Sequence, residues 1–127
     1  MRFLLDASAI IEWEKDNPEA ISIIRGSENI VTSAIAAYEV FVGLTGKKRE
    51  KAMAFFIDYP PSVFKIEDSL IAADIRNSLA KAGKMVNSLD IMIAAQAKGL
   101  GVTVLARDGH FDMIRSVCPE ISVKQIE

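Results

Sequence analysis

Four acidic residues of this 127-residue chain stand among apolar segments, where solubility alone does not call for a carboxylate. They are Asp6, Glu39, Asp90 and Asp108. A carboxylate that leaves water without gaining a partner is costly to keep ionised, so a group of them must take up protons or bind a cation. Oxygen ligands without His or Cys favour a hard ion such as Mg²⁺ or Mn²⁺. Such an ion can activate water and stabilise negative charge on a phosphodiester.

Two of these acids follow segments that are typical of buried strands. Asp6 comes directly after the apolar residues 3–5, and Asp108 comes shortly after the β-branched segment 102–105. Ligands in open α/β sheets bind at the carboxyl ends of the strands, so both acids are expected at one rim of one sheet. Each also has a local alternative: Asp6 could cap the following helix with Ser8, and Asp108 could belong to an Asp-Gly turn.

The other two acids, Glu39 and Asp90, lie in apolar stretches with helical spacing. No basic side chain stands three or four positions from either of them. A helix edge open to water is the alternative for Glu39, and attraction to the positive end of a helix is the alternative for Asp90. The four acids together favour a cation site, with Asp6 as its first corner and Ser8 left as the helix cap.

Apolar segments of strand length alternate with helical segments along the chain. Strands are predicted at residues 3–5, 30–31, 63–66, 102–105 and 121–123, and helices at 8–15, 16–26, 34–44, 47–57, 67–82, 88–97 and 111–117. This alternation indicates βαβ crossovers and an α/β sandwich with a mostly parallel sheet of about five strands. No linker or repeat interrupts it, so residues 1–127 are expected to form a single domain.

The charge balance argues against a protein that holds nucleic acid by an overall positive field, because the net charge is −2. A metal ion and a local basic patch can replace that field. The main candidates for phosphate contact are Lys47, Lys48, Arg49 and Lys51, and a second group is Arg76, Lys81 and Lys84. A solvated helix face is the alternative for both groups.

Several features favour the cytoplasm. No apolar run approaches the roughly 18–20 residues that span a bilayer, so no membrane association is expected. Asp6 interrupts the apolar start of the chain, which argues against a secretory signal. The single cysteine, Cys118, cannot form an internal disulfide and has no nucleophile signature around it.

Four segments, in their order and spacing, resemble the PIN-domain ribonucleases, and among them the small single-domain toxins of the VapC type. The segments are Leu5–Ser8, Ala37–Val40, Ser88–Ala95 and Ala106–Phe111. The resemblance implies a Rossmann-like three-layer sandwich, an acidic pocket that binds Mg²⁺ or Mn²⁺, and endonucleolytic cleavage of RNA. It also implies a homodimer and an antitoxin protein that covers the pocket.

The resemblance also assigns roles to particular positions. It implies that the catalytic acids are Asp6, Glu39, Asp90 and Asp108, and our hypothesis is that Asp6, Asp90 and Asp108 are the metal ligands among them. Ser8 matches the small hydroxyl residue that supports the first acid in this family. Two positions depart from the pattern. Ala106 stands where Thr or Ser is common, and His110 stands where a further acid is common. We interpret His110 as a surface or helix-start residue.

Three other functions fit the same fold class. A phosphoacceptor receiver domain would need a second acid beside Asp6 and a lysine where Arg107 stands. A non-catalytic module on the PIN fold would act through protein contacts, and metal titration separates it from an enzyme. A housekeeping PIN nuclease for RNA processing would cleave RNA without arresting growth.

Overall fold

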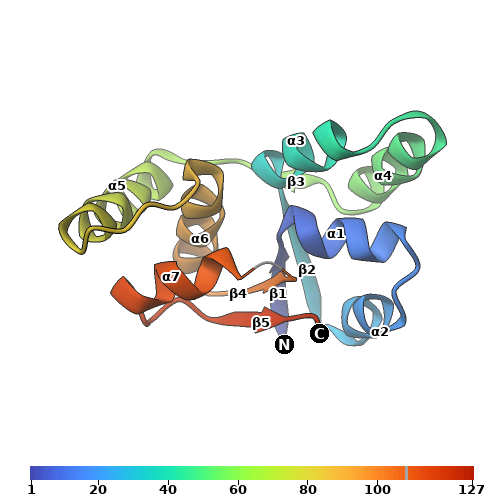
Figure 1. Ribbon diagram of the computed structural model, residues 1–127. Coiled ribbons are helices and arrows are strands. Elements are labelled where there is room, and N and C mark those ends of the chain that lie inside the picture. Colours follow the sequence, from blue (N-terminus) through green and yellow to red (C-terminus); the bar gives the residue numbers. More distant parts are fainter. Residues whose placement is uncertain (108) are drawn as a thin grey trace.

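A computed structural model describes residues 1–107 and 109–127, and over these residues five strands form one parallel sheet (Figure 1). The strands are β1 (Arg2–Leu5), β2 (Asn29–Ser33), β3 (Pro61–Ser62), β4 (Thr103–Ala106) and β5 (Val123–Gln125). The helices are α1 (Ala7–Glu14), α2 (Pro18–Gly26), α3 (Ala34–Gly43), α4 (Gly46–Asp58), α5 (Ile66–Lys81), α6 (Ser88–Leu100) and α7 (His110–Val117). The predicted α/β fold with a mostly parallel five-stranded sheet is confirmed.

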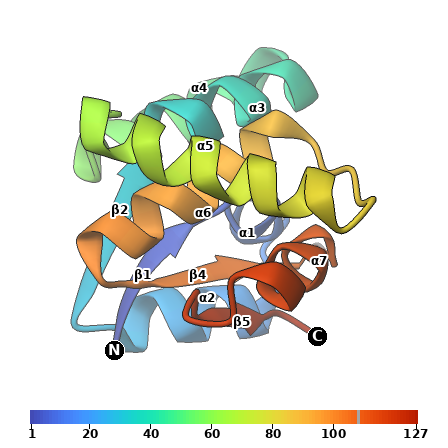
Figure 2. The ribbon, with the colours of Figure 1, turned by 90° about the vertical axis from the view of Figure 1, so that its left-hand side faces the viewer.

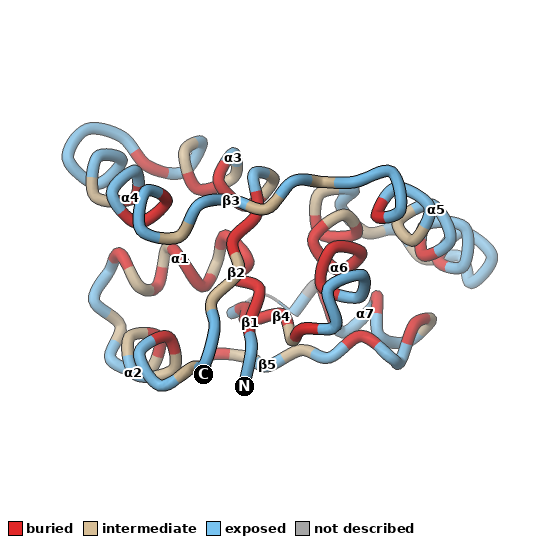
Figure 3. Tube along the Cα trace, turned by 180° about the vertical axis from the view of Figure 1, so that it is seen from behind, coloured by how far each residue is buried: buried red, intermediate tan, exposed pale blue. Residues whose placement is uncertain are grey.

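Helices cover both faces of the sheet. Helices α1 to α4 form one layer, and α5 to α7 form the other (Figure 1). In the second layer α5 packs along α6 and also contacts α7 (Figure 2). Buried residues follow the strands and recur on the helices that pack against them (Figure 3). Within the described residues, none of the helices has the length and apolarity that crossing a bilayer would require.

Strand β1 occupies the centre of the sheet, between β2 and β4. Phe3, Leu4 and Leu5 pair in register with β4 and are almost completely buried. A parallel strand with helices on both faces needs apolar side chains at every position, which explains the uninterrupted apolar run. The pairing extends one residue further, because the Asp6 amide donates to Leu105 O over 3.0 Å. The backbone of Asp6 is therefore fixed by the sheet.

The order of the strands reverses between β1 and β4. The chain adds β2 and β3 on one side of β1, and β4 and β5 on the other. At such a switch point the connections leave the carboxyl ends of neighbouring strands toward opposite faces of the sheet, which opens a crevice for ligands. The fold therefore offers one preferred place for a site, next to the carboxyl ends of β1 and β4.

The third strand differs from its predicted position at residues 63–66. The strand is β3, and its pairing with β2 ends at Ser62 opposite Ser33. Val63 is 74% exposed, and Ile66 is 73% exposed and begins α5. The prediction was wrong because it took apolar character for burial, whereas these side chains lie on the surface.

The last strand differs from its prediction as well, because it lies later in the sequence than the predicted residues 121–123. Strand β5 begins at Val123, after Ile121 has packed into the core with 2% exposure. The first bond on this side of β4 runs from the Val104 amide to Ser122 O over 2.9 Å. Ile121 is apolar because it fills the core beneath the preceding turn, and the strand pairing follows it.

Helices α5 and α6 approach each other closely at Gly99. A Cβ atom there would stand 2.8 Å from Asp68 Oδ1. Asp68 is 7% exposed, and its Oδ2 accepts the Lys65 amide over 2.9 Å at the start of α5. Asp68 can give way only by weakening that bond, so glycine at position 99 sets the distance between the two helices.

We expect Gly99→Ala to lower the free energy of unfolding by about 1 kcal/mol, because overpacking at Asp68 exceeds the helix propensity that alanine gains. The matched control is Gly26→Ala, since a Cβ on this helical glycine would meet nothing within 4 Å. Urea unfolding followed by circular dichroism measures both variants. Equal stability of the two would contradict a close contact at Gly99.

Candidate metal centre

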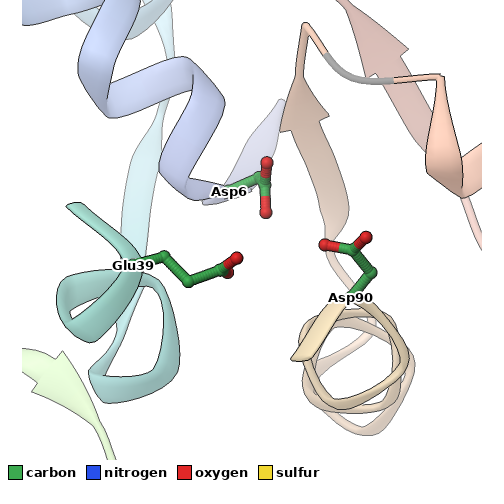
Figure 4. A group of neighbouring side chains, drawn as sticks. All are labelled: Asp6, Glu39 and Asp90. Carbon is green, nitrogen blue, oxygen red and sulfur yellow. The ribbon is translucent and has the colours of Figure 1, made fainter. Parts of the chain in front are cut away.

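Three of the four acids predicted to form a site come together at the carboxyl edge of the sheet. Asp6, Glu39 and Asp90 each offer a carboxylate oxygen, and these oxygens lie within 4.8 Å of one another (Figure 4). Asp6 is 3% exposed and Asp90 4%, whereas Glu39 is half-buried. Their side chains reach the cluster from three different elements, which are far apart in the sequence.

Asp6 reaches the cluster from the junction of β1 and α1, and it also caps α1. Its Oδ2 accepts the Ser8 amide over 3.1 Å and the Ser8 hydroxyl over 2.6 Å. The expectation that Ser8 would be the cap is therefore wrong. Asp6 has the extended backbone of an N-cap residue, whereas Ser8 already lies inside the helix. One oxygen of Asp6 thus serves the helix while the carboxylate stays in the cluster.

Glu39 reaches the cluster from the middle of α3. Its side chain points toward Asp6 and Asp90 (Figure 4), while the neighbouring Tyr38 is 59% exposed. The Oε1 atom of Glu39 has no solvent access. A helix edge open to water does not describe this position, because the carboxylate turns inward.

Asp90 lies in the first turn of α6, where the positive end of the helix favours a carboxylate. The Asn87 side chain caps this helix by accepting the Leu89 amide over 2.8 Å. The alternative for Asp90, a position at the positive end of a helix, is therefore correct. It does not compete with the cluster, because the same carboxylate also faces Asp6 and Glu39 (Figure 4).

The donor set fits a small, hard divalent cation. Three carboxylates held this close repel one another unless a proton or a cation lowers their charge. Mg²⁺ bonds of about 2.1 Å put two ligand oxygens at most about 4.2 Å apart, and this ion usually keeps several waters. Direct bonds to some of the carboxylates and water-mediated contact to the others would match the observed spacing.

Asp108, the fourth predicted acid, lies outside the described residues, and so does the side chain of His110. Ala106, the last residue of β4, is fully buried. The segment that leads from β4 toward Asp108 leaves the same edge of the sheet as Asp6, since β1 and β4 are parallel neighbours. The role of Asp108 therefore stays a prediction.

The predicted phosphate-contact residues divide into two kinds. Lys47 and Lys48 are exposed at the start of α4. Arg49 instead donates from Nε to Leu44 O over 2.9 Å and also bonds Phe41 O. Lys51 donates to Glu14 O over 2.9 Å and lies 5.0 Å from the centre of the Trp13 ring. Arg49 and Lys51 thus help to attach α4 to α3 and α1.

One further acid, Glu12, is buried although it was not among the predicted site residues. Glu12, on α1, is 6% exposed and accepts Asn17 Nδ2 over 2.9 Å and Arg107 Nη1 over 2.8 Å. The bond from Asn17, then the bond and charge of Arg107, and finally the charge of Lys15 hold the pKa of Glu12 below its ordinary value, against the effect of burial. The apolar neighbours of Glu12 in the sequence were a signal that could have identified it.

Comparison with known families gives a match over most of the chain. The PIN domain family model matches residues 3–116. A search of curated proteins by sequence found no significant match.

The chain resembles several solved structures over almost its whole length. VapBC2 from Rickettsia felis, bound to a DNA fragment from its promoter, is 17% identical with a TM-score of 0.83, covering 100% of both chains. VapBC-5 from Mycobacterium tuberculosis, a member of the VapBC family of toxin-antitoxin systems, is 20% identical with a TM-score of 0.77, covering 98% of both. FitAcB from Neisseria gonorrhoeae is 25% identical with a TM-score of 0.73, covering 95% of both.

We expect Glu39→Gln to raise the free energy of unfolding by about 1 kcal/mol in the presence of chelator, because it removes one of three neighbouring negative charges. Added Mn²⁺ should make the wild type the more stable of the two proteins, since an ion that binds only the folded state stabilises the wild type more than the variant. Thermal unfolding with EDTA and with MnCl₂ measures both effects. Glu50→Gln, at an exposed position of α4, is the control and should behave as wild type under both conditions. A less stable Glu39→Gln in chelator would contradict repulsion within the cluster.

Proposed function

Since the chain belongs to the PIN domain family, whose members are generally nucleases, we propose that it is a metal-dependent endoribonuclease and the toxin of a type II toxin–antitoxin pair. The observation that carries the proposal is the meeting of Asp6, Glu39 and Asp90 within 4.8 Å at the switch point of the sheet. Residues 1–127 act as one PIN-like domain in this proposal, and the chain works in the cytoplasm.

In this proposal Asp6 and Asp90 are the principal ligands of a Mg²⁺ or Mn²⁺ ion, and Asp108 completes the set. Such an ion would lower the pKa of a bound water and stabilise charge on the phosphodiester. Glu39, which is less buried than Asp6 and Asp90, orients the attacking water or takes its proton. Ser8 supports the first ligand through its 2.6 Å bond to Asp6.

The RNA backbone needs positive charge, which the cluster of carboxylates does not offer. Lys47 and Lys48 supply it in this proposal, because they are exposed and adjacent at the start of α4. Arg49 and Lys51 contribute through their charge, although the bonds described above also attach them to the protein. Contacts of this kind hold the strand without reading its sequence.

Large apolar side chains on the surface support the proposal that the chain binds protein partners. Pairs at helical spacing are exposed on three successive helices: Tyr38 and Val42 on α3, Met53 and Ile57 on α4, and Ile66 and Leu70 on α5. Each pair lies one turn apart on its helix, and exposed apolar side chains that adjoin one another in this way can form part of an interaction surface. We assign these surfaces to a second copy of the chain and to an antitoxin protein. The VapBC complexes that share the fold are consistent with such an assembly.

We expect Asp6→Asn to lower the rate of RNA cleavage by about a hundredfold or more, because losing about 3 kcal/mol of charge stabilisation corresponds to two powers of ten. Asparagine keeps an oxygen that can accept the Ser8 amide, so the start of α1 should survive. Gel analysis of RNA incubated with Mg²⁺ or Mn²⁺ measures the rate, and circular dichroism checks the fold. The control is Asp58→Asn, which changes an exposed acid at the end of α4. Cleavage that persists in chelator, or in Asp6→Asn at the wild-type rate, would overturn the proposal.

We expect expression of the wild-type chain to arrest the growth of a bacterial host, and co-expression of the neighbouring gene product to relieve the arrest. Asp6→Asn should leave growth unaffected, because the arrest depends on cleavage. Colony counts after induction measure the effect. RNA cleavage in vitro without growth arrest would instead favour a housekeeping PIN nuclease, and metal binding without cleavage would favour a non-catalytic module.

A further inference from the structure

The buried acid Glu12 holds Arg107 against one face of α1. Arg107 Nη1 donates to Glu12 Oε1 over 2.8 Å, and the Arg107 amide donates to Ser8 Oγ over 3.0 Å. Ser8 and Glu12 are four residues apart, so they lie one turn apart on the same side of the helix. Arg107 therefore lies along α1, with its backbone at Ser8 and its guanidinium group at Glu12.

The bond from Arg107 determines which way the Ser8 hydroxyl points. A backbone N–H can only donate, so Ser8 Oγ accepts from Arg107. The hydroxyl hydrogen of Ser8 is then directed to Asp6 Oδ2, 2.6 Å away. A chain of hydrogen bonds thus runs from Arg107 through Ser8 to Asp6. It links the segment after β4 to a carboxylate of the cluster.

The same two segments are also joined through the backbone, where the Asp6 amide donates to Leu105 O over 3.0 Å. Asp6 is therefore held on its main chain by the end of β4, and on its side chain by Ser8. Ala106, between Leu105 and Arg107, has no polar group on its side chain. The Arg107–Ser8 contact supplies a polar connection at that edge.

We propose that Glu12 and Arg107 are positioning residues, which fix the Asp6 carboxylate for metal binding by holding Arg107 against Ser8. This inference rests on the proposed metal-dependent function. Groups that orient a metal ligand through a hydrogen bond change metal affinity by about 10-fold to 100-fold when they are removed. Neither residue touches the metal or the substrate in this arrangement.

A purely structural role for the Glu12–Arg107 pair would appear in the stability of the fold and not in the affinity for metal. The Arg107 side chain is 54% exposed, and ion pairs with an exposed partner contribute little to global stability. Lys15 provides a matched comparison, because its Nζ also pairs with Glu12, at 3.7 Å. Lys15 is the C-cap residue of α1, one position beyond the helix, and its side chain is 60% exposed.

The test measures Mn²⁺ affinity by isothermal titration calorimetry in wild type and in Glu12→Gln, Arg107→Gln and Lys15→Gln. We expect the first two variants to bind Mn²⁺ about tenfold more weakly, with melting temperatures close to that of wild type. Lys15→Gln should keep the wild-type affinity. Hydrogen exchange of the residue 107 amide should be faster in Glu12→Gln and Arg107→Gln than in Lys15→Gln.

A double variant tests whether the effect passes through Ser8. Ser8→Ala with Arg107→Gln should bind Mn²⁺ no more weakly than Ser8→Ala alone, because both changes break one chain of bonds. Additive losses, wild-type affinity in Arg107→Gln, or equal losses in Lys15→Gln would overturn the inference and leave the proposed function standing. Absence of Mn²⁺ binding by the wild type would overturn both.

Discussion

Mutual repulsion among the carboxylates of the site is the constraint that the rest of this structure must overcome. Asp6, Glu39 and Asp90 lie within 4.8 Å of one another, and two of them are almost completely buried. Like charges at this distance oppose folding unless other interactions hold the groups in place. The rigid elements around them do so: a central strand paired on both sides, a capped α1, and an α6 held close to α5 at Gly99. The stability of the core thus offsets the repulsion among carboxylates that together form a site for a cation.

The topology explains why the acids meet at this edge. Asp6 follows the carboxyl end of β1 and leads into one helical layer, and Asp90 lies in the first turn of α6 in the other layer. Glu39 comes from α3, which contacts both α1 and α6. The site therefore spans the two layers of a PIN domain at the point where the strand order reverses.

The sequence predicted the parts of this arrangement that depend on local patterns. Asp6 was recognisable because it follows an apolar strand, and Glu39 because no basic residue stands three or four positions from it in the sequence. The strand predicted at residues 63–66 was wrong, because Val63 and Ile66 are apolar but exposed, and local patterns do not reveal which apolar residues face a partner. The pair formed by Glu12 and Arg107 could not be read from spacing, since a contact over this sequence distance depends on the folded sheet. Asp108 is outside the described residues, so its predicted place in the site is not tested by the fold.

The dispersal of the acids along the chain has a consequence for synthesis on the ribosome. Asp6 is made well before its backbone bond partner Leu105, because the two residues are far apart in the sequence. Strand β1 has one side of its ladder open until β4 emerges, and contacts over such sequence separations form late in folding. A nascent chain therefore carries Asp6 without its β4 neighbour until residues 103–106 have been made. The order of the strands delays completion of the backbone around the site until β4 has joined the sheet.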